Sequence, residues 1–190
     1  MRTKHFLISI LLGAAVLSGC SGTKTPTADG TTTPVQAEAA PAGFVVKVKG
    51  AEIPFEIKQA RVDVRPDVTE AQFSIANYDF EMNHMEANSL ERPKENGKVR
   101  IAFSLKGVKG EGENFKNPVQ PGEYSAEKLK WMDLYQGKDG NDEVVNLSNP
   151  TGGVTIKTVT DSELTGTIDV KGSEGLEIKG DFSAARVPTN

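Results

Sequence analysis

Apolar residues recur at every second position through most of the chain after residue 43, and this spacing is the strongest constraint on its fold. One clear run has its apolar residues at Val99, Ile101, Phe103 and Leu105. A period of two places these side chains on one face of a strand, whereas a helix would need a period near 3.6. The pattern therefore predicts half-buried strands that face a common core, and only Ser125–Lys130 could hold a helical turn.

The last part of the chain has the clearest hairpin pattern. Leu164–Val170 and Leu176–Phe182 carry alternating apolar residues on either side of the turn Gly172–Gly175. Two earlier runs instead change phase, near Lys58–Ala60 and near Ala76–Asn77. Because a slip of one residue would turn a buried face toward water, a bulge or a strand break is expected at both places.

Short strands separated by Gly, Pro, Asn and Asp turns predict an all-β domain. We expect an antiparallel β-sandwich, with a small closed β-barrel as the alternative, in either case preceded by a signal peptide and a disordered tether. The turn Pro121–Tyr124 and the closing hairpin resemble those of secreted β-sandwich modules and of uncharacterised bacterial lipoproteins, which implies a fold and no site. The expected core includes Phe55, Phe73, Phe103 and Phe182, and core packing is the favoured interpretation of Trp131.

The first residues have the three parts of an export signal. Arg2 and Lys4 precede the apolar run Phe6–Val16, and small residues follow it. A transmembrane helix needs roughly 20 apolar residues, so this run is too short to span a bilayer. We therefore expect the segment to be cleaved.

The tetrapeptide Leu17-Ser18-Gly19-Cys20 resembles the lipobox of bacterial lipoprotein signal peptides at all four positions. The resemblance implies that residues 1–19 are removed and that Cys20, the only cysteine, receives a diacylglycerol thioether, with acylation of the new amino terminus. Each buried CH₂ adds about 0.8 kcal/mol to membrane binding, so several acyl chains anchor a protein stably. Ser21 in the next position implies transfer to the outer membrane if the host is Gram-negative.

Residues 20–43 predict lipid attachment followed by a flexible tether. This segment is rich in Thr, Ala, Gly and Pro, and Val35 is its only large apolar residue. Such a composition buries too little surface to offset the entropy of ordering. Residues 44–190 then form one all-β domain. Loss of Arg2 and Lys4 lowers the formal net charge from -4 to about -6, which argues against nucleic-acid partners and leaves the lipid as the expected membrane contact.

The side chains available for chemistry are few. His84 is the only histidine after the predicted cleavage site, and a lipid-linked Cys20 cannot act as a nucleophile. Glu81, His84 and Glu86 could bind zinc, because imidazole and carboxylate groups are zinc ligands. A solvated acidic edge is the favoured interpretation, and no catalytic residue, metal or cofactor is predicted.

Asp139 belongs to a second acidic segment that invites a calcium hypothesis. Asp139, Asn141 and Glu143 recur at every second position. An EF-hand loop also needs glycine at its sixth position and glutamate at its twelfth, where this chain has Val144 and Pro150. A turn between two strands is therefore the favoured interpretation.

Two classes of function remain after these exclusions. The favoured hypothesis is an exported, lipid-anchored, non-catalytic binding or structural module of the cell envelope, with another envelope protein or a polymer as its partner. The alternative is a lipocalin-like carrier, in which the sheet encloses a cavity for a small apolar ligand. A hydrolase is a more distant alternative, because its triad would have to include His84.

Overall fold

The computed structural model describes residues 43–84, 90–108 and 117–188, and the fold below belongs to the unit Glu38–Asn190. The predicted signal peptide, the attachment site Cys20 and the predicted tether up to residue 42 lie outside the described residues. Glu86 also lies outside them.

The described part of the chain is built from strands, which confirms the all-β prediction. Three short 3-10 turns, η1, η3 and η4, are the helical elements found there. The strands are β1 (Val45–Val48), β2 (Ala51–Ile53), β3 (Gln59–Arg65), β4 (Glu70–Ala76), β5 (Val99–Lys106), β6 (Gly122–Ser125), β7 (Leu129–Lys138), β8 (Asn141–Asn146), β9 (Thr151–Val159), β10 (Glu163–Lys171) and β11 (Glu177–Arg186). The turns are η1 (Pro66–Val68), η3 (Ala126–Lys128) and η4 (Ser173–Gly175).

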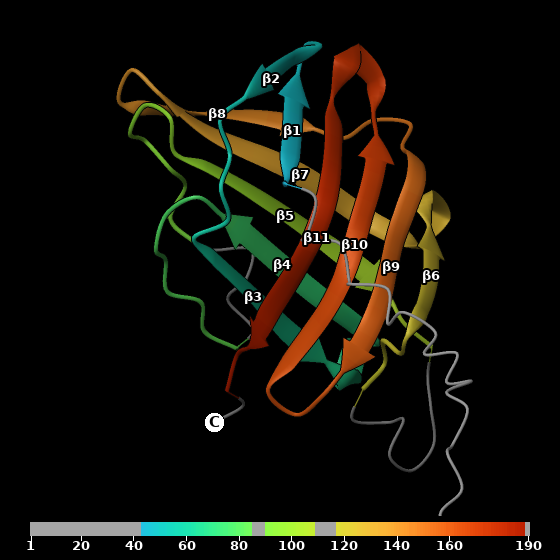
Figure 1. Cartoon of the computed structure of the whole chain (residues 1–190). Coiled ribbons are helices and arrows are strands. Elements are labelled where there is room, and N and C mark those ends of the chain that lie inside the picture. Colours follow the sequence, from blue (N-terminus) through green and yellow to red (C-terminus); the bar gives the residue numbers. More distant parts are fainter. Residues whose placement is uncertain (1–42, 85–89, 109–116, 189–190) are drawn as a thin grey trace, which may run out of the picture. The chain divides into compact units, whose positions relative to one another are not determined.

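All these strands belong to one curled sheet (Figure 1) in the order β6-β9-β10-β11-β3-β4-β5-β7-β8, with β1 and β2 added beside β11. Strand β11 joins two antiparallel blocks. Its first half pairs with β1, where Val46 lies opposite Ile178, and its last residues pair in parallel with β3, where Ala185 lies opposite Arg61. A two-sheet antiparallel sandwich is therefore not confirmed. The described sheet is also not a closed barrel, because β6 and β8 form its two ends.

The core lies on the concave side of the curled sheet. Phe73 and Phe103 stack with their ring centroids 4.7 Å apart, and Phe182 packs edge-on against both rings at 5.6 and 6.2 Å. All three are buried, as predicted. Phe55 lies at the margin of the core, where it packs against Phe44.

The predicted hairpin and strand breaks are confirmed. Strands β10 and β11 pair antiparallel around the turn that contains η4, and Val170 lies opposite Ile178. The first phase change falls where residues 54–58 separate β2 from β3, and the second falls at Ala76, the last residue of β4. The helical turn expected in Ser125–Lys130 is η3. The expectation that no other segment holds one is wrong, because η1 and η4 are also 3-10 turns.

Two further features bear on the expectations from the sequence. Trp131 lies opposite Ser104 on the face of the sheet that points away from the core, so its assignment to the core is wrong. No helix among the described residues is long and apolar enough to cross a membrane.

Candidate functional site

The outer face of β3, β4, β5 and β7 is polar and yet largely buried. The alternation that turns apolar residues toward the core turns polar ones toward this face. All the fully buried polar residues of the described chain lie on it: Asp63, Glu70, Gln72, Ser74, Arg100 and Ser104. Antiparallel sheets commonly leave one face to water, and a polar group that loses that water needs a hydrogen-bond partner. The buried polar residues therefore indicate a candidate site on this face.

Two extended segments, residues 77–84 and 90–98, contact this outer face, and we call them together the strap. The first segment follows β3: the Phe80 amide donates to Gln59 Oε1 at 2.7 Å, and the amine of Lys58 pairs with Asp79. The strap starts at the second phase change, where the chain leaves the sheet after β4.

The second segment of the strap returns along β7 and β8. Arg92 Nη1 lies 3.0 Å from Asp142 Oδ2, and the amide of Asp139 donates to Asn96 Oδ1 at 2.6 Å. Between the two segments, Phe80 and Leu90 pack against a small cluster of Met82 and Val187. Polar contacts near β3 hold the first segment of the strap, and contacts to the hairpin of β7 and β8 hold the second. The apolar cluster packs between the two segments.

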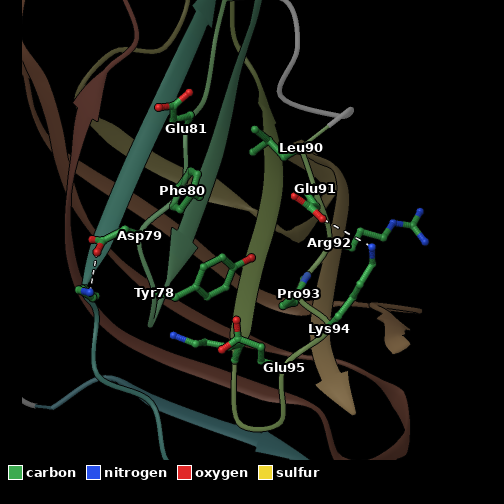
Figure 2. Close-up of a pocket in the computed structure, with 12 residues that line it drawn as sticks. Tyr78, Asp79, Phe80, Glu81, Leu90, Glu91, Arg92, Pro93, Lys94 and Glu95 are labelled. Atoms are coloured by element: carbon green, nitrogen blue, oxygen red, sulfur yellow. Dashed lines mark ion pairs between the residues drawn. The ribbon is translucent and has the colours of Figure 1, made fainter. Parts of the chain in front are cut away.

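A pocket of about 680 Å³ opens between the two segments of the strap, and we call it the strap pocket (Figure 2). Residues Tyr78–Glu81 line one side, and Leu90–Glu95 line the other (Figure 2). Two ion pairs lie on its rim, Lys58 with Asp79 at 2.5 Å and Lys94 with Glu91 at 3.5 Å. Lysines therefore neutralise Asp79 and Glu91, whereas Glu81 and Glu95, which also line the pocket, form no ion pair with a described residue.

Arg100 on β5 lies buried next to this pocket. Its guanidinium carbon is 4.7 Å from the centroid of the Tyr135 ring, and the guanidinium carbon of Arg92 is 5.2 Å from the same centroid. Lys98 Nζ lies 5.7 Å from the centroid of the Tyr78 ring. Three cations and two tyrosines thus gather at one side of the strap pocket.

The electrostatics of this cluster follow from burial. Loss of solvent lowers the pKa of Arg100, and the neighbouring charge of Arg92 lowers it further, while Tyr78 and Tyr135 oppose the shift. Burial also raises the pKa of the Tyr78 hydroxyl, which Arg100 partly offsets. The Tyr78 hydroxyl therefore stays protonated at neutral pH, where it can donate a hydrogen bond.

His84 is oriented by a buried carboxylate on the same outer face. Its Nδ1 lies 2.5 Å from Asp63 Oδ1, and the Asp63 side chain is fully buried. A carboxylate that orients an imidazole is one half of a hydrolytic triad. The nearby hydroxyls do not complete it, because Ser104 Oγ donates to Glu70 Oε2 and the buried Ser74 Oγ has no partner among the described residues.

The described residues do not assemble the metal site considered from the sequence. Glu81 lines the strap pocket, whereas His84 pairs with Asp63, and Glu86 lies outside the described residues. Within residues 43–84, 90–108 and 117–188, no group of three His, Cys, Asp or Glu side chains is placed to hold a metal ion. Glu81 and His84 therefore lack a third ligand in the described chain.

Asp139 lies in the two-residue turn between β7 and β8, as the favoured interpretation predicted. Asp139 and Gly140 both have positive φ, at 52° and 80°, which is the geometry of a type I′ hairpin turn. The neighbouring carboxylates face cations: Asp142 pairs with Arg92, and Glu143 lies 3.7 Å from Lys138. The acidic run is thus part of a turn whose carboxylates pair with lysine and arginine side chains.

Sequence reasoning missed Arg100, Tyr78 and Tyr135 as a group. Arg100 stands at a polar position of an amphipathic strand, where the pattern predicts exposure to solvent. The signal that was available is the phase change after Ala76, which marks where the chain leaves the sheet to cross its outer face.

Comparisons of the chain with protein-family models, with curated proteins and with solved structures give no match.

Proposed function

We propose that the chain is an exported, lipid-anchored, non-catalytic binding module of the bacterial cell envelope, and that the strap pocket is its binding site. Acyl chains on Cys20 hold it at the membrane, at the outer membrane in a Gram-negative host, and residues 21–43 act as a flexible spacer. The lipobox-like tetrapeptide supports the anchor, and the outer face of the sheet supports the binding role.

The observation that carries the binding role is the contrast between the two faces of the sheet. A carrier of the lipocalin type needs an open cavity inside the curl. Phe73, Phe103 and Phe182 occupy the concave side with ring contacts of 4.7 to 6.2 Å. The strap pocket on the outer face, at about 680 Å³, instead falls within the range of about 300 to 1,000 Å³ that small-molecule sites have.

A non-catalytic role is favoured over a hydrolase by the surroundings of His84. Asp63 orients the imidazole, but none of the described serine or threonine hydroxyls hydrogen-bonds to it. Nucleophilic catalysis needs such a hydroxyl within hydrogen-bond reach of the base.

The anchor is tested by partition of the full chain between detergent and water phases. We expect the wild-type protein from its native host to enter the detergent phase and Cys20→Ala to remain in water. Recovery of both proteins in the aqueous phase would contradict the proposed lipid attachment.

The binding site is tested by filling the pocket. Lys94→Trp places an indole on the pocket rim, and Lys157→Trp places one at an exposed position of β9 as the matched control. We expect a molecule that co-purifies from the native envelope with wild type and with Lys157→Trp to be lost from Lys94→Trp. Equal recovery from all three proteins would refute the strap pocket as the binding site.

A further inference from the structure

Three hydrogen-bonding atoms beside the strap pocket are buried without partners among the described residues. They are Nε and Nη1 of Arg100 and the hydroxyl of Tyr78. Arg100 is only 2% exposed, although its side chain is a cation. All three atoms can donate a hydrogen bond, and none of them meets an acceptor among the described residues.

Among the described residues, no carboxylate neutralises Arg100. Near the pocket, Asp79 pairs with Lys58, Glu91 pairs with Lys94, and Asp142 pairs with Arg92. Glu81 and Glu95 also line the pocket, and neither forms an ion pair with a described residue. Asp133, two residues before Tyr135, accepts hydrogen bonds from the Tyr135 hydroxyl at 3.1 Å and from Asn146 at 2.5 Å. The Tyr135 ring stabilises the guanidinium by a cation–π contact, which offsets only part of the loss of hydration.

Further positive charge lies next to the unpartnered donors. The charge of Arg92 acts on that of Arg100, and Arg92 and Lys98 both line the strap pocket. In Figure 2 the Tyr78 ring lies between the two segments of the strap, with its hydroxyl directed toward the 90–93 side. Arg100 is not among the residues that line the pocket, so its buried donors lie next to a lining in which cations and carboxylates are equal in number, beside the apolar surface of Phe80, Leu90 and Pro93.

We propose that the strap pocket binds a small anionic molecule through a carboxylate or phosphate group that accepts hydrogen bonds from Arg100 and from the Tyr78 hydroxyl. This inference rests on the proposed function and adds the chemical class of the ligand. A guanidinium suits either group, because its planar N–H donors match the oxygens of carboxylate and phosphate. Lys98 adds a cation to this end of the pocket, whereas Arg92 is paired with Asp142, and the apolar side contacts the rest of the ligand.

The test uses inorganic phosphate and acetate as probes of the full chain, each exchanged for chloride at constant ionic strength. NMR follows the Arg100 Nε–H signal, and the melting temperature reports binding by mass action. We expect a saturable shift of the signal and a rise in melting temperature with at least one probe. A third arm adds phosphatidylglycerol or phosphatidylcholine vesicles to Cys20→Ala, and a response to phosphatidylglycerol alone would assign the anionic group to a lipid headgroup.

Variants distinguish binding of an anion at the site from a general screening of charges by salt. Arg100→Met should abolish the rise in melting temperature with the probes, and Tyr78→Phe should weaken binding by about tenfold. Lys157→Met removes an exposed charge from β9 and should respond as wild type does. An equal rise in melting temperature in wild type and in all three variants would overturn the proposal. So would a wild-type protein that responds neither to the two ions nor to the vesicles.

The outcome also distinguishes this inference from the proposed function. If Lys94→Trp loses the co-purifying molecule while Arg100→Met retains it, the strap pocket remains the binding site and the anionic class is wrong.

Discussion

Substitution of Arg100 by methionine should stabilise the protein in a buffer that contains neither phosphate nor carboxylate. The side chain of Arg100 makes no hydrogen bond or ion pair with the described residues, so its replacement leaves no partner unsatisfied. Methionine has a similar length and fills irregular apolar space, which limits the cavity that the change creates. The substitution therefore removes a desolvation cost with little loss of contact.

The size of the effect follows from the atoms involved. A buried donor without a partner costs about 1–3 kcal/mol, and Arg100 has two such nitrogens. Loss of the cation–π contact with Tyr135 removes about 0.5–2 kcal/mol of stabilisation. The net gain in the free energy of unfolding should be about 1–3 kcal/mol, and each kcal/mol raises the melting temperature of a domain of this size by about 2–4 °C.

Arg186→Met is the matched control, because Arg186 is an arginine with partners. Its Nη1 donates to Asn117 Oδ1 at 2.7 Å and to the Thr160 carbonyl at 3.0 Å. The same substitution there should lower the melting temperature, whereas Arg100→Met should raise it, as measured by calorimetry and by urea titration. A loss of stability in Arg100→Met as large as that in Arg186→Met would refute the reasoning, because it would make Arg100 a structural residue.

Three further predictions concern the core, the strap and acid stability. Phe103→Ala should lower the free energy of unfolding in urea by about 3–5 kcal/mol, because it removes a ring that packs against two others. His84→Ala should cost about 1–3 kcal/mol and increase proteolysis of the strap, because it takes a partner from the buried carboxylate of Asp63. The hydrogen bond from Lys47 lowers the pKa of Glu177, so this pair stabilises the fold above pH 4.5 and the stabilisation is lost as the pH falls through the lowered pKa. An NMR titration should place that pKa below 4.5 in wild type and higher in Lys47→Met.

The alternation of side chains predicted the strands and most of the core, because one face of each strand must be buried. Phe73, Phe103 and Phe182 were predicted to share a core and do so. The alternation of apolar residues does not predict how the strands are arranged in the sheet. A sandwich and a curled sheet have the same period along each strand, and the parallel contact between Ala185 and Arg61 depends on residues far apart in sequence.

Trp131 illustrates the same limit on a single strand. Both faces of Leu129–Tyr135 carry apolar residues, so the period does not say which face is buried. The register decides it, because Phe103 lies opposite Met132 and Ser104 lies opposite Trp131. Pairing with β5 therefore turns the indole away from the core.

The candidate site could not be predicted from the sequence for a different reason. Alternation marks Arg100 as polar and outward, which is right, and predicts that it is solvated, which is wrong. Its burial depends on the strap, whose contacts to Gln59 and Asp142 join residues that are distant in the sequence. A strap that only covered the sheet would favour apolar residues beneath it, since an unpartnered guanidinium opposes such packing. The presence of Arg100 under the strap, beside the unpartnered hydroxyl of Tyr78, is therefore better explained by the proposed anion than by the stability of the fold.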